Sequence, residues 1–126
     1  MSHRPTVLIV EDEFLIAINA SAVFEKAGFD TVEASNADEA VAVLQERDVD
    51  VIFTDIRMPG SMDGLRLARY VRDRWPPIKI MVTSGHHLIQ NGDLPDGGVF
   101  LPKPYTDAAI IAAIGQLEGG RLAALR

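Results

Sequence analysis

The chain has 126 residues, no cysteine and a formal net charge of −6 at pH 7. This length fits one domain, and the missing cysteines exclude disulfide frameworks, thiolate metal sites and cysteine nucleophiles. The acidic balance argues against nucleic-acid binding by bulk charge, and no apolar run approaches the ~18 residues of a membrane-spanning helix. We therefore expect one cytoplasmic domain over residues 1–126, with its core at about 6–118 and a flexible or helical tail at 119–126.

The first third of the chain predicts a strand, a helix and a second strand. Residues 6–10 form a continuous apolar, β-branched run, which is typical of a strand buried on both faces. Helical spacing follows over 13–27, and Gly28 stands where a glycine commonly ends a helix. Residues 31–34 then predict a short, half-polar strand. The apolar residues that carry the helical spacing are Phe14, Leu15, Ile18 and Ala22.

The middle of the chain repeats this alternation. Asn36 and Glu39 have the spacing of a capping box at the start of a second helix. Residues 49–54 predict a third strand, and a helix follows at about 64–75, where two prolines stop it. The apolar stripe of the second helix comprises Ala37, Ala40, Val41 and Leu44.

The last third predicts two further strands, at 78–83 and 99–101, and a final helix that Thr106 caps. The final helix carries Ile110, Ile111, Ile114 and Leu117. Residues 86–97 between the two strands contain several turn-forming residues, which leaves room for one or two helical turns at most.

The ends of the predicted strands carry the polar residues that point to a function. Strands that alternate with helices indicate a parallel sheet between two helical layers, and such sheets bind ligands beyond the carboxyl ends of their strands. Clustered carboxylates repel each other unless a cation offsets their charge, and Mg²⁺ suits such oxygen ligands. A carboxylate can also attack a phosphoryl donor while Mg²⁺ and a lysine neutralise the transferring oxygens. The residues at the strand ends are Glu11, Asp12, Asp55, Thr83 and Lys103.

Each of these residues also has an ordinary structural interpretation. Acidic residues after a strand commonly cap a helix, a strand-end hydroxyl is usually satisfied locally, and a lone lysine is usually solvated. Their joint occurrence at four strand ends favours a site. For three other features we favour the structural interpretation: His86 and His87 as a polar helix start rather than a metal or phosphorelay site, Trp75 as helix-end packing, and a solvated helix face rather than a partner site for Arg66, Arg69 and Arg72.

In this order the strand-end residues resemble the response regulator receiver domain of two-component signalling. The stretches that carry the resemblance are 7–13, 54–64, 81–85 and 101–104, and the resemblance extends over about residues 6–118. It implies a flavodoxin-like, three-layer (βα)5 sandwich in the α/β class, whose five parallel strands have the order 2-1-3-4-5. It also implies a receiver of a phosphorelay, which is a signalling switch and not an enzyme. We expect a stand-alone receiver, with the receiver segment of a longer hybrid kinase or transcription factor as the alternative.

The resemblance assigns a role to each residue of the set. Asp55 is implied as the phosphoacceptor, Thr83 as the switch hydroxyl, Phe100 as the switch aromatic residue and Lys103 as the group that binds the phosphoryl oxygens, with a cis peptide before Pro104. Mg²⁺ would be held by Glu11, Asp12, Asp55 and the backbone carbonyl of Arg57. The implied partners are a histidine kinase or histidine phosphotransfer protein, a downstream protein target and, as an option, a second copy of the chain, without nucleic acid or membrane.

The sequence departs from the family pattern in three places, the first being Glu11 in place of Asp at the first acidic position, a common variation in the family. Ser61 lengthens the loop after Asp55 by one residue, and the fourth helix, within 86–97, is expected to be short or irregular. Two rival functions follow from the same residues: a receiver-fold interaction module that needs no phosphorylation, and a Mg²⁺-dependent aspartyl phosphohydrolase. The second rival usually has an acid two residues after its nucleophile, where this chain has Arg57. A dinucleotide-binding domain is disfavoured because no G-x-G-x-x-G follows the first strand.

Overall fold

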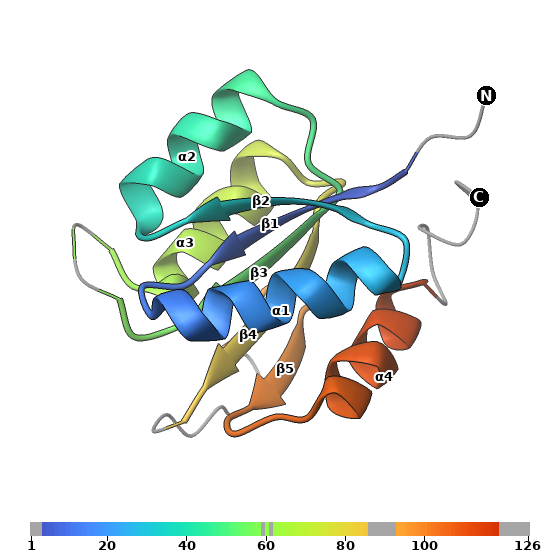
Figure 1. Ribbon diagram of the computed structural model, residues 1–126. Coiled ribbons are helices and arrows are strands. Elements are labelled where there is room, and N and C mark those ends of the chain that lie inside the picture. Colours follow the sequence, from blue (N-terminus) through green and yellow to red (C-terminus); the bar gives the residue numbers. More distant parts are fainter. Residues whose placement is uncertain (1–3, 59, 61, 86–92, 119–126) are drawn as a thin grey trace.

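The computed structural model describes residues 4–58, 60, 62–85 and 93–118, which form a sheet covered by helices on both faces (Figure 1). The strands are one parallel sheet in the order β2-β1-β3-β4-β5, as predicted. Their bounds are β1 (Thr6–Val10), β2 (Asp30–Ala34), β3 (Val51–Asp55), β4 (Lys79–Ser84) and β5 (Val99–Pro102). The helices of the described residues are α1 (Phe14–Lys26), α2 (Ala37–Glu46), α3 (Gly64–Arg74) and α4 (Asp107–Glu118).

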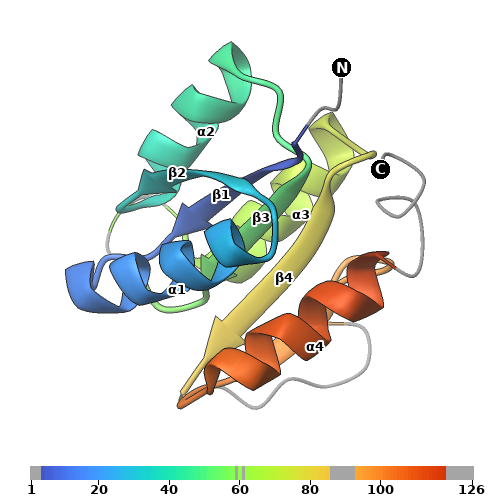
Figure 2. The same cartoon turned by 45° about the vertical axis from the view of Figure 1, so that its right-hand side comes forward.

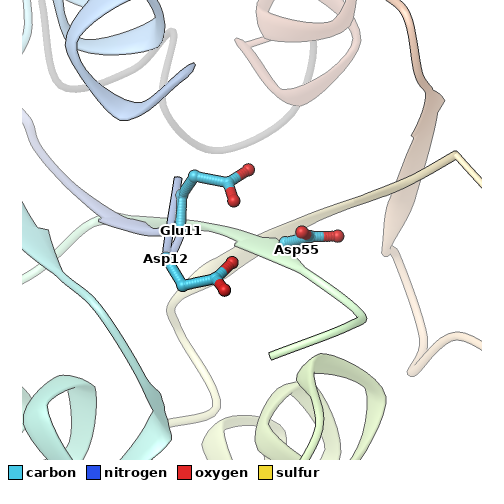
Figure 3. Close-up of side chains that lie close together, drawn as sticks. All are labelled: Glu11, Asp12 and Asp55. Atoms are coloured by element: carbon cyan, nitrogen blue, oxygen red, sulfur yellow. The ribbon is translucent and has the colours of Figure 1, made fainter. Parts of the chain in front are cut away.

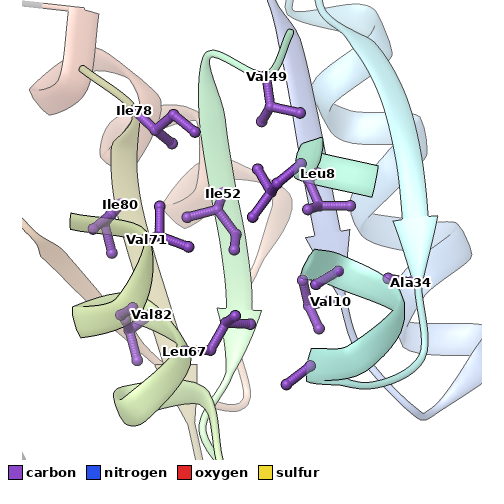
Figure 4. Packing of buried hydrophobic residues seen from close by; sticks show 14 of the residues in the cluster. Leu8, Val10, Ala34, Val49, Ile52, Leu67, Val71, Ile78, Ile80 and Val82 are labelled. Carbon is purple, nitrogen blue, oxygen red and sulfur yellow. The ribbon is translucent and has the colours of Figure 1, made fainter. Parts of the chain in front are cut away.

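Two apolar cores lie on the two faces of the sheet. Side chains alternate along each strand, so Val7 and Ile9 of β1 pack toward α1 and α4, whereas Leu8 and Val10 pack toward α2 and α3. In the turned view, α1 and α4 lie on the near side of the sheet and α3 on the far side (Figure 2). Figure 4 shows the second core, in which Ile52 of β3 lies among residues of β1, β4 and α3. Burial on both faces explains why the strands read as continuous apolar runs.

The apolar residues that indicated α1 lie on its solvent side. Phe14, Leu15 and Ile18 are 70%, 78% and 43% exposed. The rotation of the helix is set instead by Phe24, whose ring packs 5.4 Å from that of Phe29 and 5.5 Å from that of Phe53. The spacing therefore predicted the helix correctly but not its buried face, which small residues form with this ring. The buried residues of α1 are Ala17, Ala20, Ser21, Val23 and Phe24.

Local sequence signals define most helix ends. Gly28 follows α1 with φ of +103°, a conformation that glycine adopts without a steric cost. The Asn36 side chain accepts a hydrogen bond from the backbone N–H of Glu39 at 2.9 Å. The Glu39 carboxylate accepts one from the backbone N–H of Ser35 at 2.8 Å, one residue earlier than in a standard capping box. The hydroxyl of Thr106 accepts from the N–H of Ala109 at 3.1 Å, as predicted for a cap.

The connection between β4 and β5 is held by α3. The predicted short fourth helix falls mainly on 86–92, a range that includes His86 and His87 and lies outside the described residues, as does Ser61. Residues 93–98, which are described, form turns without a helix. Arg69 donates to the carbonyl of Asp93 at 3.1 Å, and Arg72 donates to that of Asp96 at 2.8 Å. We predicted that these two arginines lie on a solvated helix face. The structure differs in part, because their guanidinium groups bind backbone carbonyls of the connection between β4 and β5. Trp75 packs against the core at the end of α3, as predicted.

Candidate functional site

The site lies at the carboxyl ends of β1, β3 and β4. The parallel register pairs Val10 of β1 with Thr54, and Asp55 with Thr83, so the residues that follow these positions meet at one edge of the sheet. Glu11 and Asp55 are each only 6% exposed, whereas Asp12 is exposed. Figure 3 shows the three carboxylates gathered beside the ends of β1 and β3. Their placement confirms that the strand ends converge.

The three carboxylates could hold a cation between them. One oxygen from each of Glu11, Asp12 and Asp55 lies within 4.8 Å of the others. This set offers only hard oxygen ligands and an exposed side, which suits a magnesium ion that keeps several of its waters. Asp12 and Asp55 line a surface cavity, and Arg57, two residues after Asp55, lines it too. The donor chemistry therefore fits Mg²⁺, with Glu11, Asp12 and Asp55 as the side chains that would hold it.

Lys103 links two of the carboxylates. Its ammonium donates to Glu11 Oε1 at 2.9 Å and to Asp55 Oδ2 at 3.1 Å. Burial by itself lowers the pKa of Lys103, but the hydrogen bonds that Lys103 donates to both carboxylates, together with their negative charge, outweigh burial and hold its pKa above the ordinary value. The peptide bond to Pro104 is cis, as the resemblance implied. One ammonium thus faces three carboxylates, and the cluster keeps an excess of negative charge.

Glu11 is one of the two buried carboxylates of the cluster. Burial raises its pKa, and hydrogen bonds from Lys103 and from the backbone N–H of Glu13 offset part of that rise. The negative charge of Asp55 raises the pKa of Glu11 further. Burial and the charge of Asp55 therefore destabilise the ionised form of Glu11, and a cation beside it would stabilise that form.

Thr83 has a hydroxyl without a partner. The residue is 1% exposed, and its Oγ1 is buried and accepts or donates no hydrogen bond within the described part of the chain. A buried unpaired hydroxyl costs on the order of 1–3 kcal/mol relative to a paired one. Phe100 of β5 is half-buried and packs against the core on the α2 and α3 side. Thr83 therefore lies beside the site with a donor still to be satisfied, whereas Phe100 is in register with Val82 of β4.

Two functional neighbours were missed in the sequence. A Cβ on Gly64 would lie 1.9 Å from the carbonyl oxygen of Asp55, so this first residue of α3 rests directly on the backbone of the candidate phosphoacceptor. Tyr105 packs its ring 5.9 Å from that of Phe53, and its buried hydroxyl also lacks a partner among the described residues. Burial raises the pKa of Tyr105 to about 12. Gly64 belongs to the stretch 54–64 that carries the family resemblance, but residue type alone does not reveal its close approach to Asp55, and no periodic signal marks Tyr105.

Comparison with known proteins supports this geometry. The sequence profile of the family described as "Response regulator receiver domain" matches residues 7–115. This chain belongs to the response regulator receiver domain family. Among relatives, a putative NtrX-like response regulator of Rickettsia bellii is 35% identical over 109 residues, covering 83% of this chain and 23% of the relative. The sensor kinase CckA of Brucella abortus is 32% identical over 111 residues, covering 84% of this chain and 12% of the kinase.

Solved structures agree with the fold. The response regulator receiver protein of Sinorhizobium medicae superposes with a TM-score of 0.83 at 31% identity, covering 94% of this chain and 97% of that structure. The receiver domain of the hybrid histidine kinase CckA superposes with a TM-score of 0.74 at 27% identity, covering 88% and 96%. The chain spans less than a third of the length of the curated relatives named above. It therefore corresponds to the receiver domains of these longer proteins.

Membership of the family defines the general role. Receiver domains are signalling switches of two-component systems, they interact with histidine kinases or phosphotransfer proteins, and they bind Mg²⁺ at an acidic pocket. In the described part of this chain, the carboxylates of Glu11, Asp12 and Asp55 form an acidic cluster that could hold a metal ion. Searched over its described residues, the chain has no helix long and apolar enough to cross a membrane.

Proposed function

We propose that Asp55 of this receiver accepts a phosphoryl group from a histidine kinase or histidine phosphotransfer protein, and that the phosphorylated chain changes conformation to control a protein partner. The observation that carries the proposal is the contact of Lys103 with both Glu11 and Asp55 beside an unpaired Thr83 hydroxyl.

In the transfer step, a carboxylate oxygen of Asp55 forms a bond to phosphorus while the bond between phosphorus and the donor's imidazole nitrogen breaks. The electron pair of that bond stays on the leaving ring nitrogen, and a proton on the other ring nitrogen makes the product a neutral imidazole. Mg²⁺, held by Glu11, Asp12, Asp55 and the backbone carbonyl of Arg57, would supply charge neutralisation on the phosphoryl oxygens. Lys103 already contacts Asp55 Oδ2 at 3.1 Å and is placed to pair with an oxygen of the arriving group.

The switch follows from the unsatisfied hydroxyl. A phosphoryl group on Asp55 brings acceptor oxygens next to Thr83, whose strand position is directly paired with Asp55. The Thr83 hydroxyl would donate to one of them, and its movement would leave room for Phe100 to turn inward. This shift of population between two packings is the proposed signal.

The exposed face of α1 is the proposed contact for the protein donor. Phe14, Leu15 and Ile18 are large apolar residues exposed on the first two turns of this helix, and Leu15 lines the cavity that contains Asp55. A donor protein has to cover this rim when its histidine reaches Asp55. Burial of these side chains against a partner would supply binding energy at the right place.

The first test is labelling by a small donor. The protein is incubated with phosphoramidate and Mg²⁺, and acid-labile, hydroxylamine-sensitive phosphate is measured. The native chain and the control Asp73→Asn, an exposed residue of α3, should be labelled equally, whereas Asp55→Asn should not be labelled. Equal labelling of Asp55→Asn would assign the phosphate elsewhere. Unlabelled native protein would favour an interaction module, and multiple turnover on a phosphomonoester would favour a phosphohydrolase.

The protein donor is identified by transfer from a panel of purified, phosphorylated histidine kinases of the same organism. Transfer from the kinase that reacts fastest should slow in Phe14→Ser and remain as in the native chain in Ile111→Ala, an exposed apolar residue of α4. A rate that is equal in both variants would remove the α1 face from the proposal.

A further inference from the structure

The cavity above Asp55 is larger than a phosphoryl group requires. It has a volume of about 800 Å³, within the range of about 300–1,000 Å³ that small-molecule sites occupy. Its charged end contains Asp12, Asp55 and Lys103. The remainder of the wall combines an apolar group from α1 and from the segment before α4, namely Leu15, Ile16, Pro104 and Tyr105, with Glu13, Asn19, Arg57, Ser84 and Gly85.

The geometry of phosphoryl transfer assigns a use to the apolar wall. The attacking and leaving oxygens lie roughly in line through phosphorus, so a leaving group points away from the attacking oxygen of Asp55 and toward the open part of the cavity. Leu15 is 78% exposed and Tyr105 is half-buried, so both present surface to a molecule in that part of the cavity. An apolar leaving group would lose water against these side chains, whereas a methyl group offers little area for the same contact.

We propose that this cavity binds small acyl phosphates with an apolar, ring-sized acyl group, and that Asp55 takes its phosphoryl group from them faster than from acetyl phosphate. This inference rests on the proposed function of Asp55. A carboxylate oxygen of Asp55 forms the bond to phosphorus, the bond between phosphorus and the acyl oxygen breaks, and its electron pair leaves with the acyl group as a free carboxylate. No proton, oxidant or reductant is needed for the step.

The test compares three donors in the presence of Mg²⁺: benzoyl phosphate, acetyl phosphate and phosphoramidate, which has no acyl group. We expect the native chain to react about tenfold faster with benzoyl than with acetyl phosphate, equivalent to about 1.4 kcal/mol from packing one ring face. Leu15→Ala should reduce this ratio several-fold. Ile111→Ala, at an exposed position outside the cavity, should keep it. The intrinsic reactivities of the two donors are the same for every protein, so they cancel when the ratio of a variant is divided by the ratio of the native chain.

The outcomes separate the two proposals. Labelling by phosphoramidate with equal benzoyl and acetyl rates would overturn the acyl site and leave the function of Asp55 intact. No labelling by any donor would overturn both. A second readout is independent of transfer: the phosphonate analogue of benzoyl phosphate, with a methylene in place of the bridging oxygen, should shift the NMR signals of Leu15 and Ile16. Shifts confined to the charged end would refute contact with the apolar wall.

Discussion

Asp12→Asn is the sharpest test of the repulsion between the carboxylates of the acidic cluster. Asp12 is exposed and lies within 4.8 Å of carboxylate oxygens of Glu11 and Asp55, and Lys103 contacts those two carboxylates but not Asp12. Two like charges at this separation repel by about 1 kcal/mol in water and by about 3.5 kcal/mol at an effective dielectric constant of ~20. Because Asp12 is exposed, the lower value applies to each of its two neighbours. The Lys103 ammonium, which contacts both neighbours, offsets about one of these two repulsions. Removal of the Asp12 charge should therefore raise the free energy of unfolding by about 1 kcal/mol.

The assay is urea denaturation in the presence of EDTA, repeated with Mg²⁺ and at 1 M NaCl. The matched control is Glu13→Gln, an exposed neighbour outside the carboxylate cluster that changes the net charge equally. Salt should shrink the difference, since the screening length falls to about 3 Å at 1 M. Mg²⁺ at 100 times its dissociation constant should stabilise the native protein by about 2.7 kcal/mol and the variant less.

Two results would refute this reasoning. One is a stability of Asp12→Asn in EDTA that is no higher than that of the native chain. The other is an equal gain of both proteins from Mg²⁺, which would place the ion away from Asp12. A gain in Glu13→Gln as large as in Asp12→Asn would attribute the effect to overall charge and not to the cluster.

Three further predictions concern the neighbours of this cluster. Lys103→Met should lower the free energy of unfolding at pH 7 by about 3–5 kcal/mol, because it leaves buried carboxylates unpaired. The folded-state pKa of Lys103 is raised above 10.5, so its stabilisation is complete below pH 10.5 and is lost as pH rises through the folded-state pKa. The deficit of the variant, measured by urea denaturation, should therefore shrink at pH 11 and above. Gly64→Ala should destabilise the protein by about 3 kcal/mol or more in thermal unfolding, because its Cβ would meet the Asp55 carbonyl. Gly115→Ala, whose Cβ would have nothing within 4 Å, should stabilise the protein by up to about 1 kcal/mol. Equal effects of the two substitutions would contradict the close approach at Gly64. Thr83→Val should leave the unfolding temperature unchanged or raise it, with a gain of up to about 1 kcal/mol, because it removes an unpaired buried hydroxyl, and a clear loss would mean that the hydroxyl has a partner.

The strand-end chemistry could be predicted because of a general property of parallel sheets. All strands run in the same direction, so the residues after each strand arrive at the same edge whatever the helices between them do. Glu11, Asp12 and Asp55 needed only correct strand bounds to be brought together, and the apolar runs supplied those bounds. The convergence of Lys103 on the same carboxylates followed from the same rule.

Contacts that depend on the rotation of a helix or on close approach could not be predicted in this way. The spacing of Phe14, Leu15 and Ile18 is that of a helix, but the packing of Phe24 on Phe29 and Phe53 turned those residues outward. Gly64 shows its importance only once α3 is seen resting on the backbone of Asp55.

The sequence by itself determined the order of strands and helices, the family, and the acidic cluster behind the net charge of −6, because these depend on residue type and on one-dimensional spacing. The tertiary structure alone decided how that charge is distributed: Lys103 offsets the two buried carboxylates Glu11 and Asp55, and Asp12 stays exposed beside them. It also turned the apolar face of α1 toward solvent at the rim of the cavity. These features arise from packing between segments far apart in the chain, and no local pattern encodes the rotation and depth at which those segments meet.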